Sequence, residues 1–571
     1  MSTANMSWEE AIATITGPGA AFEVVDADIR GVPLKVFKST PPSLRAAFQI
    51  ARTRSDDTFL VYQDERLSFG HVMSAIDELA AGLVQNFSVR PGDRVAIAMR
   101  NYPEWIIAFA AITSVGAIAV CLNAWWTPEE MAYGLEDSGS SILIGDRERL
   151  ERAATATHRL GIRSIGVRLA SVTPAGVTRY EDAVVSGAAL PDVDIDPQDD
   201  ATILYTSGTT GFPKGAVSTH HAIMSALMAY SCRATASAMA NPPAEKHPDP
   251  TSFILCVPLF HVTGLVPVML SCFLGGFKLV IMYKWDPQRA LEHIEKERIT
   301  VFVGVPTMSW DLLESPDFAQ RDTSSLLSVG GGGAPAPPEL VHRIDRGFSK
   351  GRPGMGYGMT ETNAYGPQNS GDDLIRKPRS AGRTVPIMEL KIADFSDPAN
   401  PANPVGREVP RGEVGEILFK GPTLIRGYWN KPEATAETIV DGWLRSGDIG
   451  RMDEEGFIFV EDRAKDMVIR AGENIYCAEV EAAIYQYPSV HEAAVFGVPH
   501  ERLGEELAVA IVPRRGAAFD VDELRAYLAQ HIASFKIPSI VDLKTDPLPR
   551  NAAGKILKRS LRDAWVSSHS S

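Results

Sequence analysis

The sequence ILYTSGTTGFPKGAV, residues 203–217, joins a short apolar run to a loop rich in Ser, Thr and Gly. The apolar run (201–206) is typical of a buried β-strand, and six consecutive Ser, Thr or Gly residues from its end argue against a plain surface turn. Glycines let backbone N–H groups approach an anion, hydroxyls add hydrogen-bond donors, and Lys214 adds positive charge. Pro213 and Gly215 flank this lysine, which excludes a Walker A loop. The stretch therefore predicts a phosphate-binding loop of another kind.

On both sides of this loop, β-branched runs alternate with helical patterns through about the first 350 residues. Such alternation predicts an α/β domain with buried sheets. Strands are expected at 94–99, 117–122, 141–145, 201–206, 253–259, 278–282 and 301–306, and a helix at 287–298. Exposed loops are expected at 233–250, which is rich in Ala and Pro, and at 396–412. From about residue 463 the pattern predicts a small α+β domain.

Length and composition narrow the class of protein. The chain has 571 residues, which favours more than one domain, and its net charge of −15 disfavours general nucleic-acid binding because an acidic surface repels phosphate backbones. Five scattered cysteines without a CxxC pair signal neither a zinc site nor a disulfide framework. We expect a reduced, cytoplasmic protein, since the N-terminus has no signal-peptide pattern.

The segment from Trp105 to Trp126 carries no charge, so a membrane span has to be weighed. The alternative is a buried helix that starts near Pro103, is broken at Gly116 and is followed by a buried strand. We favour the buried helix because the segment only just reaches spanning length and no basic flank orients it. No transmembrane segment is therefore predicted, while peripheral membrane contact and a homodimer stay open.

Further motifs follow the phosphate loop in a defined order: GGGGAP (330–335), YGMTE (357–361), GWLRSGDIG (442–450), DRAKDMVIRAGENIYCAEVE (462–481) and PRNAAGKILK (549–558). Together they resemble the signature motifs of the adenylate-forming superfamily, which includes acyl-CoA synthetases, luciferase and peptide-synthetase adenylation domains. The chain is most similar to a fatty-acid–CoA ligase. The resemblance implies an α/β fold, with a large N-terminal domain of sheets flanked by helices (1–462), a hinge (463–465) and a small mobile α+β C-terminal domain (466–571).

The reaction implied by this resemblance joins a carboxylic acid to ATP and then passes the acyl group to coenzyme A. Attack of a carboxylate on the α-phosphate brings two anions together, so the barrier is largely electrostatic. No general base is needed for this step because the acid is already ionised at pH 7. The site has to supply positioning, a Mg²⁺ ion and cationic side chains.

The resemblance implies a role for particular residues of the ATP site. Tyr357 is expected against the adenine, Thr360 near the α-phosphate and Glu361 on Mg²⁺. Asp448 is expected to accept the ribose hydroxyls, and Lys555 to bridge the carboxylate and the α-phosphate. The catalytic set is Lys555, Glu361, Thr360 and Lys214, and the ATP-binding set is Thr206, Ser207, Gly208, Thr209, Thr210, Gly211, Lys214, Gly333, Ala334, Pro335, Tyr357, Gly358, Thr360, Asp448 and Arg463.

The same resemblance assigns the acyl and coenzyme A sites. The acyl-binding residues are expected to be His261, Val262, Gly264, Gly331 and Gly332, and the tunnel for coenzyme A is expected along Ala471, Gly472 and Glu473. Lys465 falls at the hinge, where a charged and flexible position suits a rotation of the C-terminal domain. No residue is marked as a general base for the thiol.

The identity of the acid is less well defined by the sequence. The expected acyl-binding residues are mostly small and uncharged, which favours an apolar acyl group over an amino acid, whose ammonium would need a buried Asp. A medium- or long-chain fatty acid is the first choice and an aromatic or alicyclic acid the second. Transfer to a carrier-protein pantetheine is an alternative. A non-catalytic sensor would be expected to lose Lys555, Glu361 or the phosphate loop, and all three are intact.

Overall fold

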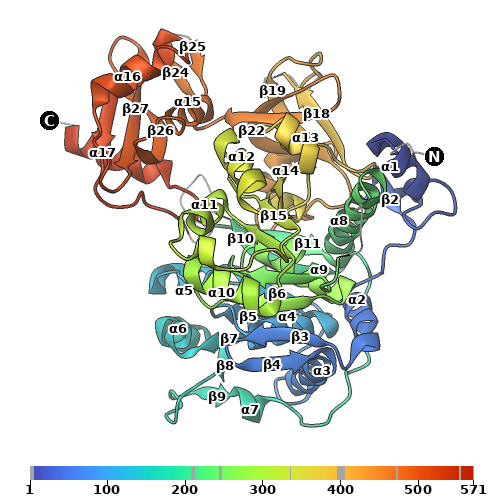
Figure 1. Cartoon of the computed structure of the whole chain (residues 1–571). Helices are drawn as coiled ribbons and strands as arrows, with labels where there is room; N and C mark the ends of the chain where they lie inside the picture. Colours follow the sequence, from blue (N-terminus) through green and yellow to red (C-terminus); the bar gives the residue numbers. More distant parts are fainter. Residues whose placement is uncertain are drawn as a thin grey trace.

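The computed structural model describes residues 6–206, 213–242, 247–334, 336–394, 405–470, 473–551 and 554–569 (Figure 1). Two large sheets with flanking helices form the body of the N-terminal part, and a third sheet lies above them. A smaller unit, red in Figure 1, follows at the C-terminus. The predicted α/β class, with a large domain of sheets and helices and a smaller C-terminal domain, is confirmed.

The first large sheet contains the strand that precedes the phosphate loop. Within the described residues its order is β20 (Gly427–Tyr428), β11 (Lys214–Thr219), β10 (Asp200–Thr206), β6 (Ile118–Cys121), β5 (Arg94–Ala98), β7 (Ile142–Asp146), β8 (Arg163–Val167) and β9 (Val177–Arg179). Strands β10 and β11 are antiparallel, with Thr206 opposite Lys214. The predicted loop is therefore the connection of a hairpin.

The second large sheet carries most of the other motifs. Its order, within the described residues, is β17 (Gln368–Ser370), β16 (Arg352–Gly356), β15 (Ser328–Gly331), β14 (Val301–Gly304), β12 (Ser252–Leu255), β13 (Lys278–Ile281), β3 (Thr58–Tyr62) and β4 (Glu65–Ser68). The neighbours β12, β14, β15 and β16 all run parallel. Their carboxyl ends therefore meet at one edge of the sheet, where ligands bind in open α/β sheets.

Two smaller sheets complete the N-terminal part and the C-terminal domain. The third sheet contains β18 (Glu389–Ala393), β19 (Gly415–Lys420), β22 (Trp443–Met452), β21 (Ile439–Val440) and β23 (Ile458–Arg463). The C-terminal sheet contains β25 (Glu473–Ile475), β24 (Val468–Arg470), β27 (Gly504–Pro513), β26 (Val490–His500) and β28 (Ile540–Leu543). A hairpin of β1 (Val24–Ile29) and β2 (Val32–Phe37) lies near the N-terminus.

The helices cover the faces of these sheets. In the N-terminal part they are α1 (Trp8–Thr16), α2 (Leu44–Ala51), α3 (Phe69–Gln85), α4 (Pro103–Ser114), α5 (Pro128–Ser138), α6 (Arg147–Leu160), α7 (Tyr180–Ala183), α8 (His220–Ala240), α9 (Ser271–Gly275), α10 (Pro287–Glu297), α11 (Pro306–Glu314), α12 (Pro338–Gly347), α13 (Gly371–Arg376) and α14 (Pro432–Thr438). The C-terminal domain has α15 (Cys477–Ile484), α16 (Val521–Leu528) and α17 (Lys558–His569). Short helical turns are η1 (Arg52–Arg54), η2 (Gly264–Leu270), η3 (Phe318–Gln320), η4 (Thr360–Thr362) and η5 (Ser534–Lys536).

The uncharged segment is a buried helix followed by a buried strand, as predicted. Helix α4 begins at Pro103, whose fixed φ and missing N–H suit a first helical position. Gly116 takes a φ of +72° between α4 and β6, a conformation that favours glycine. Among the described residues, no helix is both long and apolar enough to cross a membrane.

The prediction of an exposed loop at 233–250 is wrong for residues 233–240, which are helical. Helix α8 continues through ATASAMA and ends at Ala240. Alanine has the highest intrinsic helix propensity, so the Ala-rich stretch extends the helix until Asn241 and the prolines that follow. The other expected loop, 396–412, lies partly outside the described residues.

Replacing Trp105 tests how strongly the buried helix supports the domain. The Trp105 side chain is fully buried and stacks on Phe109 with ring centroids 5.5 Å apart. We expect Trp105→Ala to lower the free energy of unfolding by about 3–5 kcal/mol, the usual cost of removing a buried aromatic ring. Trp125→Ala is the matched control, because Trp125 is 43% exposed. Urea unfolding followed by circular dichroism measures both, and equal losses would contradict the assignment.

Candidate active site

Three of the sequence segments come together because each lies at the carboxyl end of a parallel strand in the second sheet. GGGGAP begins in the last two residues of β15, YGMTE follows β16, and the segment with His261 follows β12. Since these strands are parallel neighbours of β14, their carboxyl-end loops lie side by side. The sheet thus brings together segments that are up to about 100 residues apart in the sequence.

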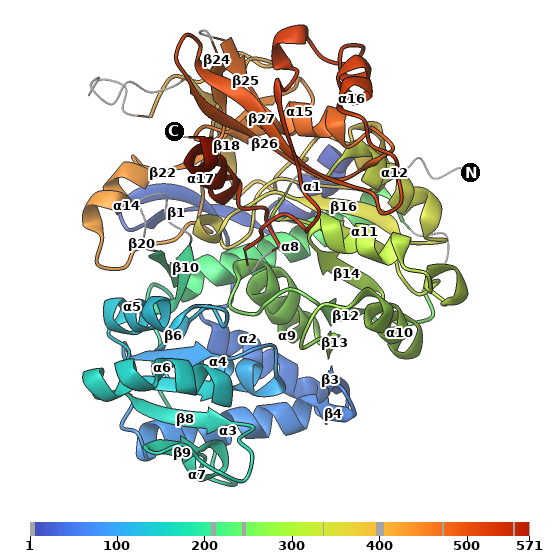
Figure 2. The same ribbon diagram turned by 90° about the vertical axis from the view of Figure 1, so that its left-hand side faces the viewer.

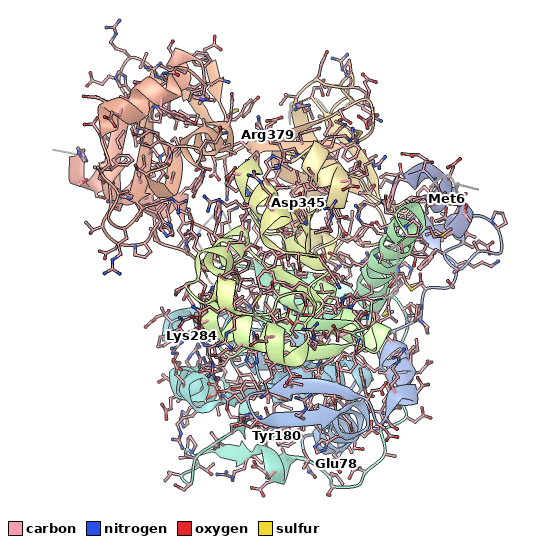
Figure 3. All side chains as sticks on the ribbon, in the orientation of Figure 1. Met6, Glu78, Tyr180, Lys284, Asp345 and Arg379 are labelled. Atoms are coloured by element: carbon pink, nitrogen blue, oxygen red, sulfur yellow. The ribbon has the colours of Figure 1, made fainter. Side chains whose placement is uncertain are left out.

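A pocket at this edge is closed on one side by the C-terminal domain. It is lined by residues from the N-terminal part, among them Gly333, Ala334, Tyr357, Gly358, Arg379, Asp448 and Arg463, and by residues of the C-terminal domain, among them Asp466, Glu481, Lys555 and Lys558. Figure 3 labels Arg379 where the two parts face each other. Seven residues of the predicted ATP and catalytic sets therefore share one pocket: Gly333, Ala334, Tyr357, Gly358, Asp448, Arg463 and Lys555.

The Asp448 carboxylate is held from two sides. The Tyr357 hydroxyl donates to its Oδ2 at 2.6 Å, and the Arg463 Nε lies 3.3 Å from its Oδ1. Asp448 on β22 is also the register partner of Arg463 on β23. Burial and the neighbouring carboxylate raise the pKa of Tyr357 well above its usual range, so its hydroxyl stays protonated. A carboxylate offers about four acceptor positions, so Asp448 retains capacity for further donors such as hydroxyl groups.

Glu361 is buried beside a tyrosine and a lysine from other segments. Its Oε1 accepts a hydrogen bond of 2.7 Å from the Tyr428 hydroxyl, and the Lys214 ammonium lies 5.0 Å from the centre of the Tyr428 ring. Burial raises the pKa of Glu361, while the Tyr428 hydrogen bond opposes that rise. Tyr428 therefore connects the lysine of the phosphate loop with the predicted metal ligand.

The residues at this position fit a Mg²⁺ ion that is held mainly by phosphate. Glu361 supplies one buried carboxylate, whose oxygens can act as metal ligands. The described residues hold no cluster of three or more His, Cys, Asp or Glu side chains that could bind a metal unaided. Mg²⁺ is usually bound by one or two carboxylates together with substrate phosphates and water. Glu361 is thus suited to hold a Mg²⁺ ion that arrives with a nucleotide.

Lys555 reaches the pocket on a loop that packs closely against the N-terminal domain. Gly554 has a φ of +81°, and a Cβ added there would lie 3.1 Å from Cγ2 of Val305. The backbone N–H of Lys555 donates to Oδ1 of Asn551 at 2.9 Å. Burial, together with the nearby Arg463 guanidinium, lowers the pKa of the Lys555 ammonium to about 8.

The predicted acyl-binding residues lie along the neighbouring strand ends. Burial lowers the pKa of His261 to about 4, so its imidazole is neutral at pH 7. Its Nε2 is buried without a hydrogen-bond partner in the part of the chain that the structure describes. Val262 is buried, and a Cβ on Gly264 would lie 2.4 Å from the Pro258 carbonyl oxygen, which gives this glycine a packing role. Gly331 ends β15, with Gly332 directly after it.

Of the residues expected to line the coenzyme A tunnel, the structure describes Glu473, whose strand lies away from the pocket. Ala471 and Gly472 are outside the described residues, and the exposed Glu473 begins β25. Both ribbon views place β24 and β25 at the end of the C-terminal domain that faces away from the large sheets (Figures 1 and 2). Lys465 lies in the turn between β23 and β24, beside Arg463 and Asp466, and burial lowers the pKa of Lys465. Its role as a hinge stays a prediction.

Two profiles match the chain: that of the AMP-binding enzyme over residues 47–429, and that of the AMP-binding enzyme C-terminal domain over residues 479–555. The chain belongs to the AMP-binding enzyme family. The predicted membership of the adenylate-forming superfamily is thereby confirmed.

This AMP-binding enzyme is similar to proteins that use different acids. A feruloyl-CoA synthase of Amycolatopsis sp is 37% identical over 515 residues, which cover 90% of this chain and 96% of that protein. A long-chain-fatty-acid–CoA ligase of Bacillus subtilis is 31% identical over 545 residues, or 90% of this chain and 93% of that protein. ATP-bound MatB from Rhodopseudomonas palustris superposes with a TM-score of 0.78 at 28% identity, covering 92% of this chain and 99% of that one.

Several predicted residues are not placed by the structure. Ser207, Gly208, Thr209, Thr210, Gly211 and Pro335 lie outside the described residues, as do Ala471 and Gly472.

Other predicted residues are described but do not line the pocket. Thr206 ends β10, and its hydroxyl donates to the Lys214 carbonyl oxygen at 3.4 Å. Thr360 and Glu361 lie in the turn η4, directly after the pocket residues of YGMTE. The roles assigned to all these residues stay predictions.

Tyr428 is a residue of this AMP-binding enzyme that the sequence analysis missed. It stands in the stretch RGYWN, 67 residues after its hydrogen-bond partner Glu361. Strand β20 reaches Glu361 only because it pairs with β11 at the edge of the first sheet. The residues around Tyr428 do not indicate that this strand pairs with β11, and a single tyrosine beside a glycine does not by itself point to a functional site.

Removing the Tyr428 hydroxyl tests its support of Glu361. A hydrogen bond to a charged group contributes about 1.5–3 kcal/mol, so we expect Tyr428→Phe to raise the Mg²⁺ concentration for half-maximal pyrophosphate release at least about tenfold. Tyr180→Phe is the matched control. Its hydroxyl is buried without a hydrogen-bond partner among the described residues. Figure 3 labels Tyr180 at the end of the molecule that lies away from the C-terminal domain. An unchanged Mg²⁺ requirement in Tyr428→Phe would contradict this role.

The lowered pKa of Lys555 predicts a pH dependence of acid activation. Below a pKa of about 8 the side chain is a cation, and above it the cation is lost. Since kcat/KM reports the ionisation of the free enzyme, kcat/KM for pyrophosphate release should fall as pH rises from 7 to 9. Lys555→Arg, whose guanidinium stays charged, should lack this decline. A flat wild-type profile over the same range would contradict the prediction.

Proposed function

We propose that this enzyme activates an apolar carboxylic acid as its acyl-adenylate and then forms the thioester of coenzyme A. In the first step a carboxylate oxygen bonds to the α-phosphorus of ATP, and the bond to the β-phosphate oxygen breaks to release pyrophosphate. In the second step the thiol sulfur bonds to the acyl carbonyl carbon, AMP leaves, and the thiol proton passes to solvent. Membership of the family supports the coarser statement directly: the chain is an AMP-forming acid–thiol ligase that uses ATP, Mg²⁺ and coenzyme A.

One observation carries the assignment of the first step. Lys555, from the C-terminal domain, lines the same pocket as Tyr357 and Asp448 of the N-terminal domain. A nucleotide in this pocket with its ribose on Asp448 would present its phosphates to cationic side chains from both domains. Preorganised charges of this kind act on the negative charge of the transition state without rearranging during the reaction.

The roles of the chain's own residues follow from their surroundings. Tyr357 and Arg463 fix the orientation of the Asp448 carboxylate, which receives the ribose hydroxyls. Lys214 and Lys555 offset the repulsion between the incoming carboxylate and the α-phosphate. Glu361, held by Tyr428, would bind Mg²⁺, which supplies further positive charge to the phosphate oxygens when bound.

The second step is proposed to follow a rotation about Lys465. In the described orientation the strands that flank the predicted tunnel turn lie away from the pocket (Figure 2). Only a change of orientation can bring Glu473 and its neighbours to the acyl-adenylate. Such a rotation also withdraws Lys555, which is no longer needed once pyrophosphate has left.

The neutral surroundings of the predicted acyl site support an apolar acid. His261 is uncharged at pH 7 because burial lowers its pKa to about 4, and Val262 is buried. Neither residue offers the counter-charge that an amino acid or a dicarboxylic acid would require. The 37% identity to a feruloyl-CoA synthase favours a ring-bearing acid as the first candidate. The 31% identity to a long-chain-fatty-acid–CoA ligase favours a medium- or long-chain fatty acid as the second.

A screen of acids tests this proposal. Pyrophosphate release is measured with ATP and Mg²⁺ for ferulic, cinnamic and benzoic acids, an alicyclic acid, fatty acids of 6 to 16 carbons, and an amino acid and a dicarboxylic acid for comparison, each with and without coenzyme A. We expect acid-dependent release with a ring-bearing or fatty acid, and thioester only when coenzyme A is present. Release with amino acids or dicarboxylic acids alone would contradict the apolar assignment.

Substitution of Lys555 separates the two steps. We expect Lys555→Ala to lower acid-dependent pyrophosphate release by about 10²–10³-fold, the usual cost of removing a charge-stabilising donor. Thioester formation from preformed acyl-adenylate and coenzyme A should stay near the wild-type rate. Lys544→Ala, on the same domain but outside the pocket lining, is the control. Equal losses in both steps would contradict the role proposed for Lys555.

A further inference from the structure

Both ends of helix α11 contact the C-terminal domain. At its start, Val305 caps the helix and packs against Gly554, the residue before Lys555. At its end, Glu314 accepts a 2.6 Å hydrogen bond from Nη1 of Arg514, which follows β27. Val305 and Glu314 are nine positions apart along the helix, so the two points lie about 13 Å apart on a rigid element. Two contacts on one rigid helix fix how the C-terminal domain is turned.

The contact at the end of α11 is a cluster of four side chains, which we call the α11 latch: Trp310, Glu314, Arg343 and Arg514. The Arg343 and Arg514 guanidinium groups lie 4.8 and 6.0 Å from the centre of the Trp310 ring. Glu314 lies 3.6 Å from Arg343 and 2.6 Å from Arg514. Arg514 belongs to the C-terminal domain, and the other three belong to α11 and α12. One carboxylate and one indole ring therefore bind a guanidinium from each domain.

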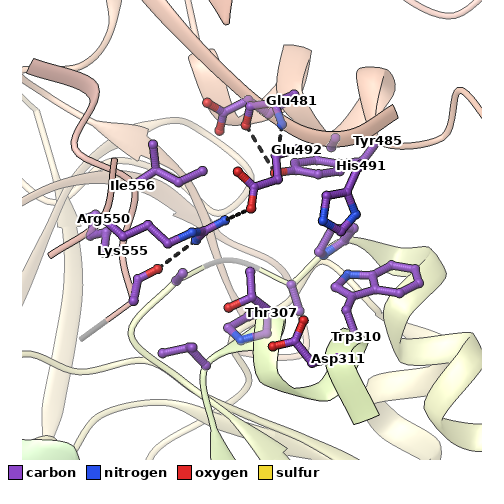
Figure 4. A pocket seen from close by; sticks show the side chains of 18 of the residues that line it. Thr307, Trp310, Asp311, Glu481, Tyr485, His491, Glu492, Arg550, Lys555 and Ile556 are labelled. Atoms are coloured by element: carbon purple, nitrogen blue, oxygen red, sulfur yellow. Dashed lines mark hydrogen bonds and ion pairs between the residues drawn. The ribbon is translucent and has the colours of Figure 1, made fainter. Parts of the chain in front are cut away.

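The space between the two contacts forms a second pocket that joins the domains. Figure 4 shows Thr307, Trp310 and Asp311 of α11 on one side, and Tyr485, His491 and Glu492 of the C-terminal domain on the other. Lys555 and Arg550 lie at the same pocket, beside the start of α11. The latch, this pocket and the Lys555 loop thus lie along a single interface.

We propose that Glu314 and Arg514 are positioning residues that hold Lys555 in the nucleotide pocket during acid activation and separate before acyl transfer. This inference rests on the proposed function, because it assigns the latched orientation to the first step. Neither residue lines the nucleotide pocket, so their effect is transmitted through the orientation of the domain. Rotation about Lys465 would carry Arg514 away from α11, which breaks the ion pair and withdraws Lys555 together.

The exposure of the pair suits a reversible contact. The side chains of Arg514 and Glu314 are 32% and 31% exposed. An ion pair of this exposure, with a cation–π contact beside it, shifts an equilibrium by about three- to tenfold. A fully buried pair would leave an uncompensated charge on separation and would oppose the rotation strongly. The latch therefore favours the activating orientation without preventing the second step.

The test compares the two half-reactions in full-length variants. Arg514→Ala removes the cation from the latch, and Arg515→Ala removes an adjacent exposed arginine as the matched control. Glu314→Arg replaces the shared carboxylate by a third guanidinium group, which should repel those of Arg343 and Arg514. The double variant Glu314→Arg/Arg514→Glu restores a pair of opposite charges with reversed polarity. Thermal unfolding of each variant serves as the control for correct folding.

We expect Arg514→Ala to lower acid-dependent pyrophosphate release about three- to tenfold and Glu314→Arg to lower it further. The probe acid is ferulate or decanoate, whichever gives the larger wild-type rate. Thioester formation from the preformed adenylate of that acid should be unchanged or faster. The double variant should recover pyrophosphate release to within about threefold of the wild type.

Three results would overturn the positioning role proposed for Glu314 and Arg514. One is unaltered pyrophosphate release in both single variants, the second is an equal loss in both half-reactions, and the third is a double variant as slow as Glu314→Arg. Failure of the proposed function gives a different result, since the wild type itself would then release no pyrophosphate with any of the acids.

Discussion

The repulsion between two anions is the constraint that explains the arrangement of this enzyme. A carboxylate has to approach the α-phosphate of ATP, and in a site shielded from water like charges at contact distance repel strongly. In the function proposed above, cationic side chains from two separate segments offset this repulsion: Lys214 after the phosphate loop and Lys555 in the C-terminal domain. Lys555 is the one that the proposed domain rotation would add or remove.

The rest of the structure places these charges. Parallel strands bring their carboxyl-end loops to one edge, Asp448 is held by Tyr357 and Arg463, and Tyr428 links Lys214 with Glu361. The close approach of Gly554 to Val305 and the latch at the other end of α11 set the position of Lys555. Under the proposed rotation, a lysine supplied by a separate domain would be withdrawn once pyrophosphate has left, so that one pocket would serve two reactions in turn.

Sequence reasoning predicted the parts of the site that are written in contiguous motifs. The strand before the phosphate loop and the buried helix at 103–114 follow from patterns within a few residues. Tyr357, Asp448 and Lys555, which line one pocket, were assigned through the resemblance of their motifs to a family. The extension of α8 to Ala240 was missed because an Ala-rich stretch near prolines was interpreted as a loop. Tyr428, Glu314 and Arg514 could not be predicted, since their partners lie 67 to 200 residues away and depend on how sheets and domains pack.

The account is tested most directly by a structure of the enzyme with its acid substrate, Mg²⁺ and α,β-methylene-ATP, a nucleotide whose pyrophosphate cannot leave. The quantity to measure is the distance from Nζ of Lys555 to the nearest oxygen of the α-phosphate or of the acid. We predict a hydrogen-bond distance of about 2.7–3.2 Å, with the ribose on Asp448. A nucleotide bound in this pocket with no cationic group of the C-terminal domain within about 6 Å of the α-phosphate oxygens, a distance at which no hydrogen bond forms, would contradict the central claim.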